Sequence, residues 1–158
     1  MIPALGAREA SAICDTSHMA ELEPRDIVAS YVERVWNLGD SSAVVEYCAD
    51  PYVRHDAGRS RVMSHAEQLE RVTGERLAGT AADGRSLHFE TLLLAGDGRD
   101  VTWVWNMTGP TGTELAASGV EAEVVADELR ICGIEVFRVV DGRITEVWNS
   151  PPMAGHWG

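Results

Sequence analysis

The stretch 129–148 constrains the fold of this chain more than any other. Two runs rich in β-branched residues flank the dipeptide Asp141-Gly142. This dipeptide favours a type I′ turn, because Gly adopts positive φ freely and Asp tolerates it. The pattern therefore predicts a β-hairpin, and the rest of the chain must supply a layer that covers its apolar face.

Alternation of side chains along the two strands assigns their faces. One face of the first strand carries Ile131, Gly133, Glu135, Phe137 and Val139, and one face of the second carries Thr145, Val147 and Asn149. A carboxylate is unusual in such a setting. Burial without a nearby cation would raise the pKa of Glu135 and make it a usable acid or base.

Helical patterns precede the strands along the chain. Apolar stripes and end signals predict helices at residues 24–38, 41–48 and 65–77, and Ser64 with Glu67 forms a capping box for the third. Strands are expected at 87–95 and 101–108, whereas 113–127 fits either a helical turn or the start of a strand. This order predicts an α+β domain at 24–150, after a loose arm at 1–23 and before a tail at 151–158.

Composition excludes several classes of protein. The net charge of −12 argues against nucleic acid and anionic membranes as partners. All thirteen basic residues are Arg, so a Schiff-base lysine and a P-loop lysine are excluded. Three widely spaced cysteines, and no recognisable secretory signal or transmembrane run, predict a cytoplasmic protein. No metal-ligand spacing or glycine-rich phosphate loop occurs, so we expect neither a metal nor another cofactor.

Four segments, 31–40, 48–56, 101–109 and 133–148, resemble the SnoaL-like polyketide cyclase family. This family belongs to the nuclear transport factor 2-like superfamily, which also contains ketosteroid isomerase. The resemblance implies a cone-shaped α+β barrel, in which a curved and mainly antiparallel sheet wraps around three helices. It also implies a pocket at the open end of the cone and a homodimer. The apolar residues Ile134, Val136 and Trp148 should form the dimer contact on the outer face of the sheet.

The resemblance also implies positions for the site. The polyketide cyclases use a His in the penultimate strand and an Asp at the end of the last strand, and Glu135 and Asn149 stand at these places here. Asn149 can form hydrogen bonds but cannot titrate. The carboxylate base of ketosteroid isomerase aligns with His55, whose charge can change near neutral pH.

Each candidate residue also has a structural interpretation. His55 is either a general base or a histidine bonded to backbone; Glu135 is either an acid or base, or an ion-pair partner of an Arg. Asn149 either orients a substrate or caps the chain before Pro151. Substrate contacts are predicted at Tyr31, Trp103, Trp105 and Phe137, of which Tyr31 and the two Trp could also be core or interface residues.

Two functions from different classes are consistent with these residues. The first is a cofactor-independent enzyme that isomerises, cyclises or dehydrates a small, mostly apolar carbonyl compound through His55, Glu135 and Asn149. The second is a non-catalytic protein that binds a small molecule or a peptide in the same pocket. A pocket in which His55 and Glu135 face each other would favour the enzyme.

Overall fold

A single sheet of eight strands is the central element of the fold. The structure is a computed structural model that describes residues 22–158. The path of the sheet runs through β2 (Arg59–Met63), β1 (Cys48–Asp56), β7 (Arg143–Asn149), β6 (Glu128–Val140), β4 (Asp100–Pro110) and β3 (His88–Ala95). Two short strands, β5 (Glu123–Val125) and β8 (Met153–Ala154), also pair with β6. β1 and β7 are parallel, and every other described pair is antiparallel. The prediction of a mainly antiparallel sheet is confirmed.

The predicted hairpin joins β6 to β7. Asp141 and Gly142 have φ angles of 50° and 75°, and positive φ at both positions is what a type I′ turn requires. Across this hairpin Glu135 pairs with Asn149. The turn therefore brings together Glu135 and Asn149, the two residues that the resemblance predicts at the acid/base positions.

The alternation predicted for the second strand is wrong next to the turn. The register shifts between Arg138 and Val139, so that Val139 lies opposite Ile144. Ile144 is fully buried, whereas Thr145 donates its hydroxyl to the carbonyl of Arg138. A β-bulge places one extra residue in a strand. Thr145 is therefore not on the face predicted for it.

The three predicted helical segments are present, with local changes in geometry. They are α2 (Pro24–Tyr31) continued by the π-helical η1 (Val32–Asn37), the 3₁₀ turn η2 (Ser41–Ala43) continued by α3 (Val44–Tyr47), and α4 (His65–Ala78). The capping box of α4 is formed as predicted, because the Ser64 hydroxyl accepts the Glu67 N–H and the Glu67 carboxylate accepts the Ser64 N–H. The ambiguous segment 113–127 contains α5 (Glu114–Ala117) followed by β5.

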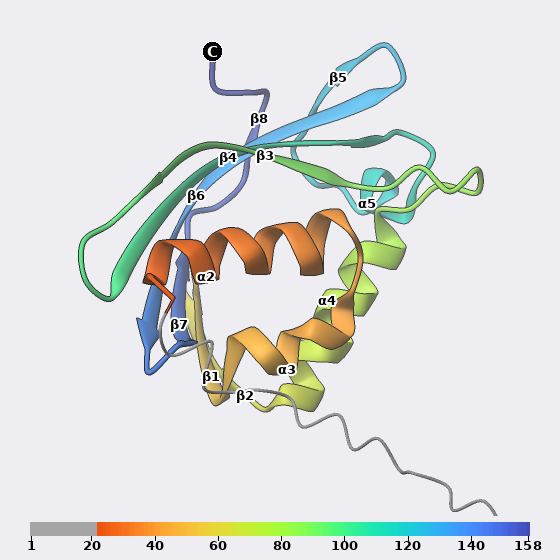
Figure 1. Cartoon of the computed structure of the whole chain (residues 1–158). Coiled ribbons are helices and arrows are strands. Elements are labelled where there is room, and N and C mark those ends of the chain that lie inside the picture. Colours follow the sequence, from red (N-terminus) through yellow and green to blue (C-terminus); the bar gives the residue numbers. More distant parts are fainter. Residues whose placement is uncertain (1–21) are drawn as a thin grey trace, which may run out of the picture.

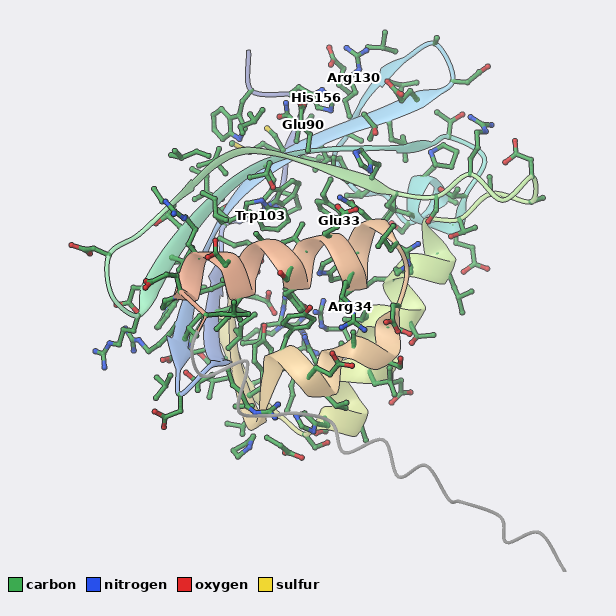
Figure 2. The ribbon with its side chains drawn as sticks, in the orientation of Figure 1. Glu33, Arg34, Glu90, Trp103, Arg130 and His156 are labelled. Carbon is green, nitrogen blue, oxygen red and sulfur yellow. The ribbon has the colours of Figure 1, made fainter. Side chains whose placement is uncertain are left out.

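The helices lie against the concave side of the curved sheet. Figure 1 shows α2 beneath β3, β4 and β6, with α3 and α4 on the same side. Trp103 of β4 lies between the sheet and α2, whereas Glu90 and His156 lie on the opposite side of the sheet (Figure 2). This arrangement is the predicted α+β cone. No helix within residues 22–158 is long and apolar enough to span a membrane. The predicted arm at 1–23 lies almost entirely outside the described residues.

Candidate functional site

A pocket of about 520 Å³ lies between the helices and the concave face of the sheet. Pockets that bind small molecules commonly measure about 300–1,000 Å³. Strands β1, β3, β4 and β6 contribute side chains to its lining, together with α2, α4 and the segment that follows β7. The pocket therefore has the size and place of a small-molecule site.

Aromatic side chains form one wall of this pocket. They are Tyr31, Trp36, Phe89, Trp103, Trp105 and Phe137. The ring centroids of Phe89 and Trp105 lie 5.3 Å apart, and those of Trp103 and Trp105 lie 5.7 Å apart. All four residues predicted to contact a substrate thus line the pocket. Trp103 and Phe137 also belong to the core, because only 2% and 1% of their surfaces are exposed.

The indole of Trp105 lines the pocket but keeps its own N–H buried without a partner among the described residues. Trp103 donates its ring N–H to the hydroxyl of Thr91 at 2.9 Å, but the buried N–H of Trp105 has no partner in the part of the chain that the structure describes. The ring lies over Gly133 of β6, where an added Cβ would come within 2.4 Å of it. The absence of a side chain at Gly133 therefore permits this position of Trp105.

Charged side chains gather around Asp56 at another side of the pocket. Its carboxylate lies 2.9 Å from Nε of Arg54, 3.5 Å from Nη2 of Arg61 and 3.8 Å from Nε of Arg59. The side-chain amide of Asn149 donates to the same carboxylate at 3.3 Å. Of these residues, Arg54, Arg59, Asp56 and Asn149 line the pocket. The pocket is therefore not purely apolar.

A second ion pair lies on α4. Arg71 donates through Nη1 to the carboxylate of Glu75 at 2.8 Å and through Nε to Gln68 at 3.1 Å. Arg71 and Glu75 both line the pocket. Their spacing of four residues is typical of ion pairs on a helix. The sequence shows this spacing, but no feature of the sequence indicated that Arg71 and Glu75 would line a pocket.

Glu135 is the carboxyl group of this site that lacks a partner. It lines the pocket, yet within residues 22–158 no Arg or His nitrogen lies within 4.0 Å of its carboxylate and no hydrogen bond reaches it. Burial raises its pKa from 4.5 to about 7, and the charges of Arg54 and Arg71 oppose this rise. The part of its surface that remains accessible faces the pocket. Glu135 can therefore exchange a proton with a bound molecule near neutral pH.

Asn149 lies beside Glu135, as its cross-strand partner. Its Nδ2 donates to the carbonyl of His55 at 3.1 Å and to Asp56 at 3.3 Å. Its buried Oδ1 has no hydrogen-bond partner among the described residues. Asn149 is thus anchored through one end of its amide, and beside the pocket it keeps a buried acceptor without a partner in the described part of the chain.

The prediction that His55 lies in the pocket is wrong. Its Nε2 lies 2.7 Å from the carboxylate of Glu146 and its Nδ1 lies 2.7 Å from the Ser60 hydroxyl. Its ring stacks on Trp148, with centroids 5.0 Å apart. Since neighbouring residues of a strand point to opposite faces, the inward positions on β1 belong to Arg54 and Asp56. The same alternation, read from the sequence, could have identified these two residues.

Among residues 22–158, no group of three or more His, Cys, Asp or Glu side chains is placed to hold a metal ion. The polar side chains that line the pocket carry guanidinium, carboxyl, amide, phenol, indole and hydroxyl groups. The chemistry that these groups can supply directly is proton transfer and hydrogen bonding.

Comparison with known proteins identifies the family. Residues 28–147 match the model of the SnoaL-like domain. The chain belongs to the SnoaL-like domain family. A search of curated proteins gives no match.

Solved structures that are similar to this chain are named after several different activities. A candidate polyketide cyclase from Acidithiobacillus ferrooxidans is 23% identical, with a TM-score of 0.65 over 80% of this chain and 87% of that chain. An LEH-like epoxide hydrolase from M. tuberculosis is 16% identical, with a TM-score of 0.57 over 80% of each chain. A candidate ketosteroid isomerase from Kribbella flavida is 15% identical, with a TM-score of 0.57 over 85% of this chain and 82% of that chain. These similarities establish the fold of this SnoaL-like domain.

Proposed function

We propose that this protein is a cofactor-independent enzyme that transfers protons on a small, mostly apolar carbonyl compound. The observation that carries the proposal is Glu135, an unpaired carboxyl group that faces the pocket with a pKa raised to about 7 by burial. A general acid or base is most effective when its pKa lies near the working pH. Isomerisation, cyclisation and dehydration of carbonyl compounds all use such a group.

The proposed reaction starts with Glu135 in its ionised form. Its carboxylate accepts a proton from the carbon next to the carbonyl group, the C–H electron pair moves toward the carbonyl, and negative charge develops on the carbonyl oxygen. The hydroxyl of Tyr31 and the terminal N–H groups of Arg54 are the pocket donors proposed to stabilise that oxygen. Glu135 then returns the proton to a different atom, which completes an isomerisation.

Tyr31 and Asn149 have supporting roles in this proposal. Burial raises the pKa of the Tyr31 hydroxyl above its usual range, so the hydroxyl stays protonated and can donate to a substrate oxygen. Asn149 lines the pocket beside Glu135, and its buried Oδ1 is an acceptor without a partner among the described residues. The proposal assigns no catalytic role to His55, because its ring nitrogens lie against Ser60 and Glu146.

Hydrogen–deuterium exchange into 2-tetralone tests this proposal without knowledge of the natural substrate. This ketone is flat and has acidic C–H groups next to its carbonyl. In D₂O we expect the protein to accelerate the exchange, with a rate that rises with pH around a midpoint near 7 as Glu135 ionises. NMR spectra recorded with and without protein between pH 5 and 9 give this profile. Binding of 2-tetralone without any acceleration would instead support the alternative, a non-catalytic binding protein.

We also propose a homodimer through the outer face of the sheet. Ile134 is 36% exposed and lies opposite Val104, and Val136 lies between Thr102 and Trp148 in the same sheet. An apolar row of this kind is typical of a surface that is covered by a partner. Residues Cys48 and Cys132 are free thiols, which supports the cytoplasmic location expected from the sequence.

A dimer predicts a mass near twice the 17.2 kDa of one chain. Light scattering at micromolar concentration measures this mass. The variant Val136→Arg should yield the monomer, because it places a charge in the proposed contact. Leu77→Arg is the matched control, since Leu77 is 69% exposed on α4. A monomeric wild-type protein would contradict the proposal.

A further inference from the structure

Arg54 presents unused hydrogen-bond donors to the pocket. Its Nε lies 2.9 Å from the carboxylate of Asp56, but without the geometry of a hydrogen bond. Its side chain makes no hydrogen bond with any residue from 22 to 158, and only Nε is fully buried. A guanidinium group carries five N–H donors in a planar fork. The four N–H groups of Nη1 and Nη2 therefore remain available, on a residue that lines the pocket.

Positive charge is in excess around Arg54. The single carboxylate of Asp56 is shared among Arg54, Arg59 and Arg61, at distances of 2.9, 3.8 and 3.5 Å. Two other carboxyl groups act on this region: Glu75 is paired with Arg71, and Glu135 is neutral whenever it carries a proton. The whole chain has a net charge of −12, so the charge around Arg54 is opposite in sign to the net charge of the protein.

The aromatic wall supplies a complementary surface for the remainder of a ligand. Trp36, Phe89 and Trp105 offer flat apolar faces within the same pocket. Trp105 is only 7% exposed and its N–H is buried, so the wall offers apolar ring surface. A ligand that satisfies this pocket needs a flat apolar body and an oxygen group that accepts several N–H bonds.

We propose that the pocket binds a flat, largely apolar carboxylate whose two oxygens accept hydrogen bonds from the terminal nitrogens of Arg54. This inference rests on the proposed function of the same pocket and adds the class of substrate. Carboxylate and guanidinium groups match in shape, and their paired N–H···O bonds are stronger than bonds between neutral groups. The apolar body of the ligand lies against the aromatic wall. Glu135 and the Oδ1 of Asn149 are acceptors near the same space, which disfavours a group with two negative charges such as a phosphate.

Calorimetric titration with 2-naphthoate and 2-naphthamide tests this proposal. The two probes have nearly the same size and shape and differ in charge. At pH 6, where most of Glu135 is protonated, we expect the wild-type protein to bind 2-naphthoate at least about tenfold more tightly than 2-naphthamide. Arg54→Gln should reduce this preference to less than about twofold. The matched control Arg99→Gln should leave it unchanged, because Arg99 is 65% exposed and its nearest acid is 3.9 Å away.

The variant Arg54→Lys provides a second measurement. It retains the charge but loses the planar fork, so its preference for 2-naphthoate should lie between those of the wild type and Arg54→Gln. If Arg54→Gln does not fold, the preference of Arg54→Lys relative to the wild type tests the proposal instead. Equal or tighter binding of 2-naphthamide by the wild type would overturn the proposal, as would a full preference in Arg54→Gln.

Glu135→Gln separates this inference from the proposed function. The variant should keep the preference for 2-naphthoate while losing exchange into 2-tetralone. A protein that exchanges deuterium but shows no preference for the anion would refute the substrate class alone. A protein that prefers the anion but catalyses no exchange would refute the enzymatic proposal alone.

Discussion

Replacing Glu135 with Gln is expected to lower the rate of proton transfer by about 100- to 10,000-fold and to stabilise the folded protein at pH 8. Gln has nearly the same shape as Glu but cannot release or accept the proton. The stabilisation arises because ionised Glu135 is partly removed from water and has no ion-pair partner among the described residues.

The sign of this effect follows from the two pKa values. The carboxyl group of Glu135 has a pKa of about 7 in the folded protein, against an ordinary value of 4.5. Its favourable contribution to folding is therefore complete below pH 4.5 and is lost as the pH rises to about 7. At about 1.4 kcal/mol for each pKa unit, this loss is about 3 kcal/mol. Glu135→Gln should match the wild type near pH 4 and be more stable above pH 7.

Urea unfolding at several pH values, together with the exchange assay, measures both effects. The matched control is Glu90→Gln, because Glu90 is exposed on the opposite side of the sheet (Figure 2). This control should change neither the exchange rate nor the pH dependence of stability. A loss of stability at pH 8 in Glu135→Gln, with the exchange rate intact, would show that Glu135 is structural.

The second large effect is expected for Trp103→Ala, which should lower the free energy of unfolding by about 3–5 kcal/mol. Trp103 is 2% exposed and is among the largest fully buried side chains of the described residues. Its ring lies 5.6 to 6.2 Å from the rings of Phe89, Trp105 and Phe137, and its N–H donates to Thr91. Alanine would leave a cavity at the junction between the core and the pocket wall.

Urea unfolding of Trp103→Ala and Trp103→Phe measures this effect. The Phe variant keeps an aromatic ring and loses the hydrogen bond to Thr91, so it should cost less than the Ala variant. A cost below about 1 kcal/mol for Trp103→Ala would contradict the packing described here.

Features of the fold that depend on neighbouring residues could be predicted from the sequence. The turn at Asp141-Gly142 and the capping box at Ser64 are determined by a few adjacent residues, and both are present as predicted. The face of Thr145 could not be predicted, because the bulge beside Val139 reflects how two strands fit into the curved sheet. The short strand β8 was missed because it gains its order by pairing with β6, and for the same reason the sequence left the segment that contains β5 open between a helical turn and a strand.

The candidate site was predicted in part. Glu135, Trp103, Trp105 and Phe137 were found because alternation along strands places their side chains on the inner face, and Tyr31 was found from the apolar stripe of its helix. Trp36 and Phe89 of the aromatic wall were not predicted. His55 was selected because it aligns with the base of ketosteroid isomerase and can titrate near neutral pH. The alternation along β1 directs Arg54 and Asp56 inward when His55 faces outward. The contribution of Arg71 depends on how α4 packs against the sheet, which no local pattern of residues determines.

Direct titration of the Glu135 carboxyl group is the most decisive measurement. The side-chain carboxyl carbon is followed by ¹³C NMR from pH 4 to 9, and its signal is assigned by its absence in Glu135→Gln. A buried and unpaired carboxyl group should titrate with a midpoint near 7. A midpoint at or below 4.5 would mean that Glu135 is solvated or ion-paired, and it would contradict both the proposed acid/base role and the stabilisation expected for Glu135→Gln.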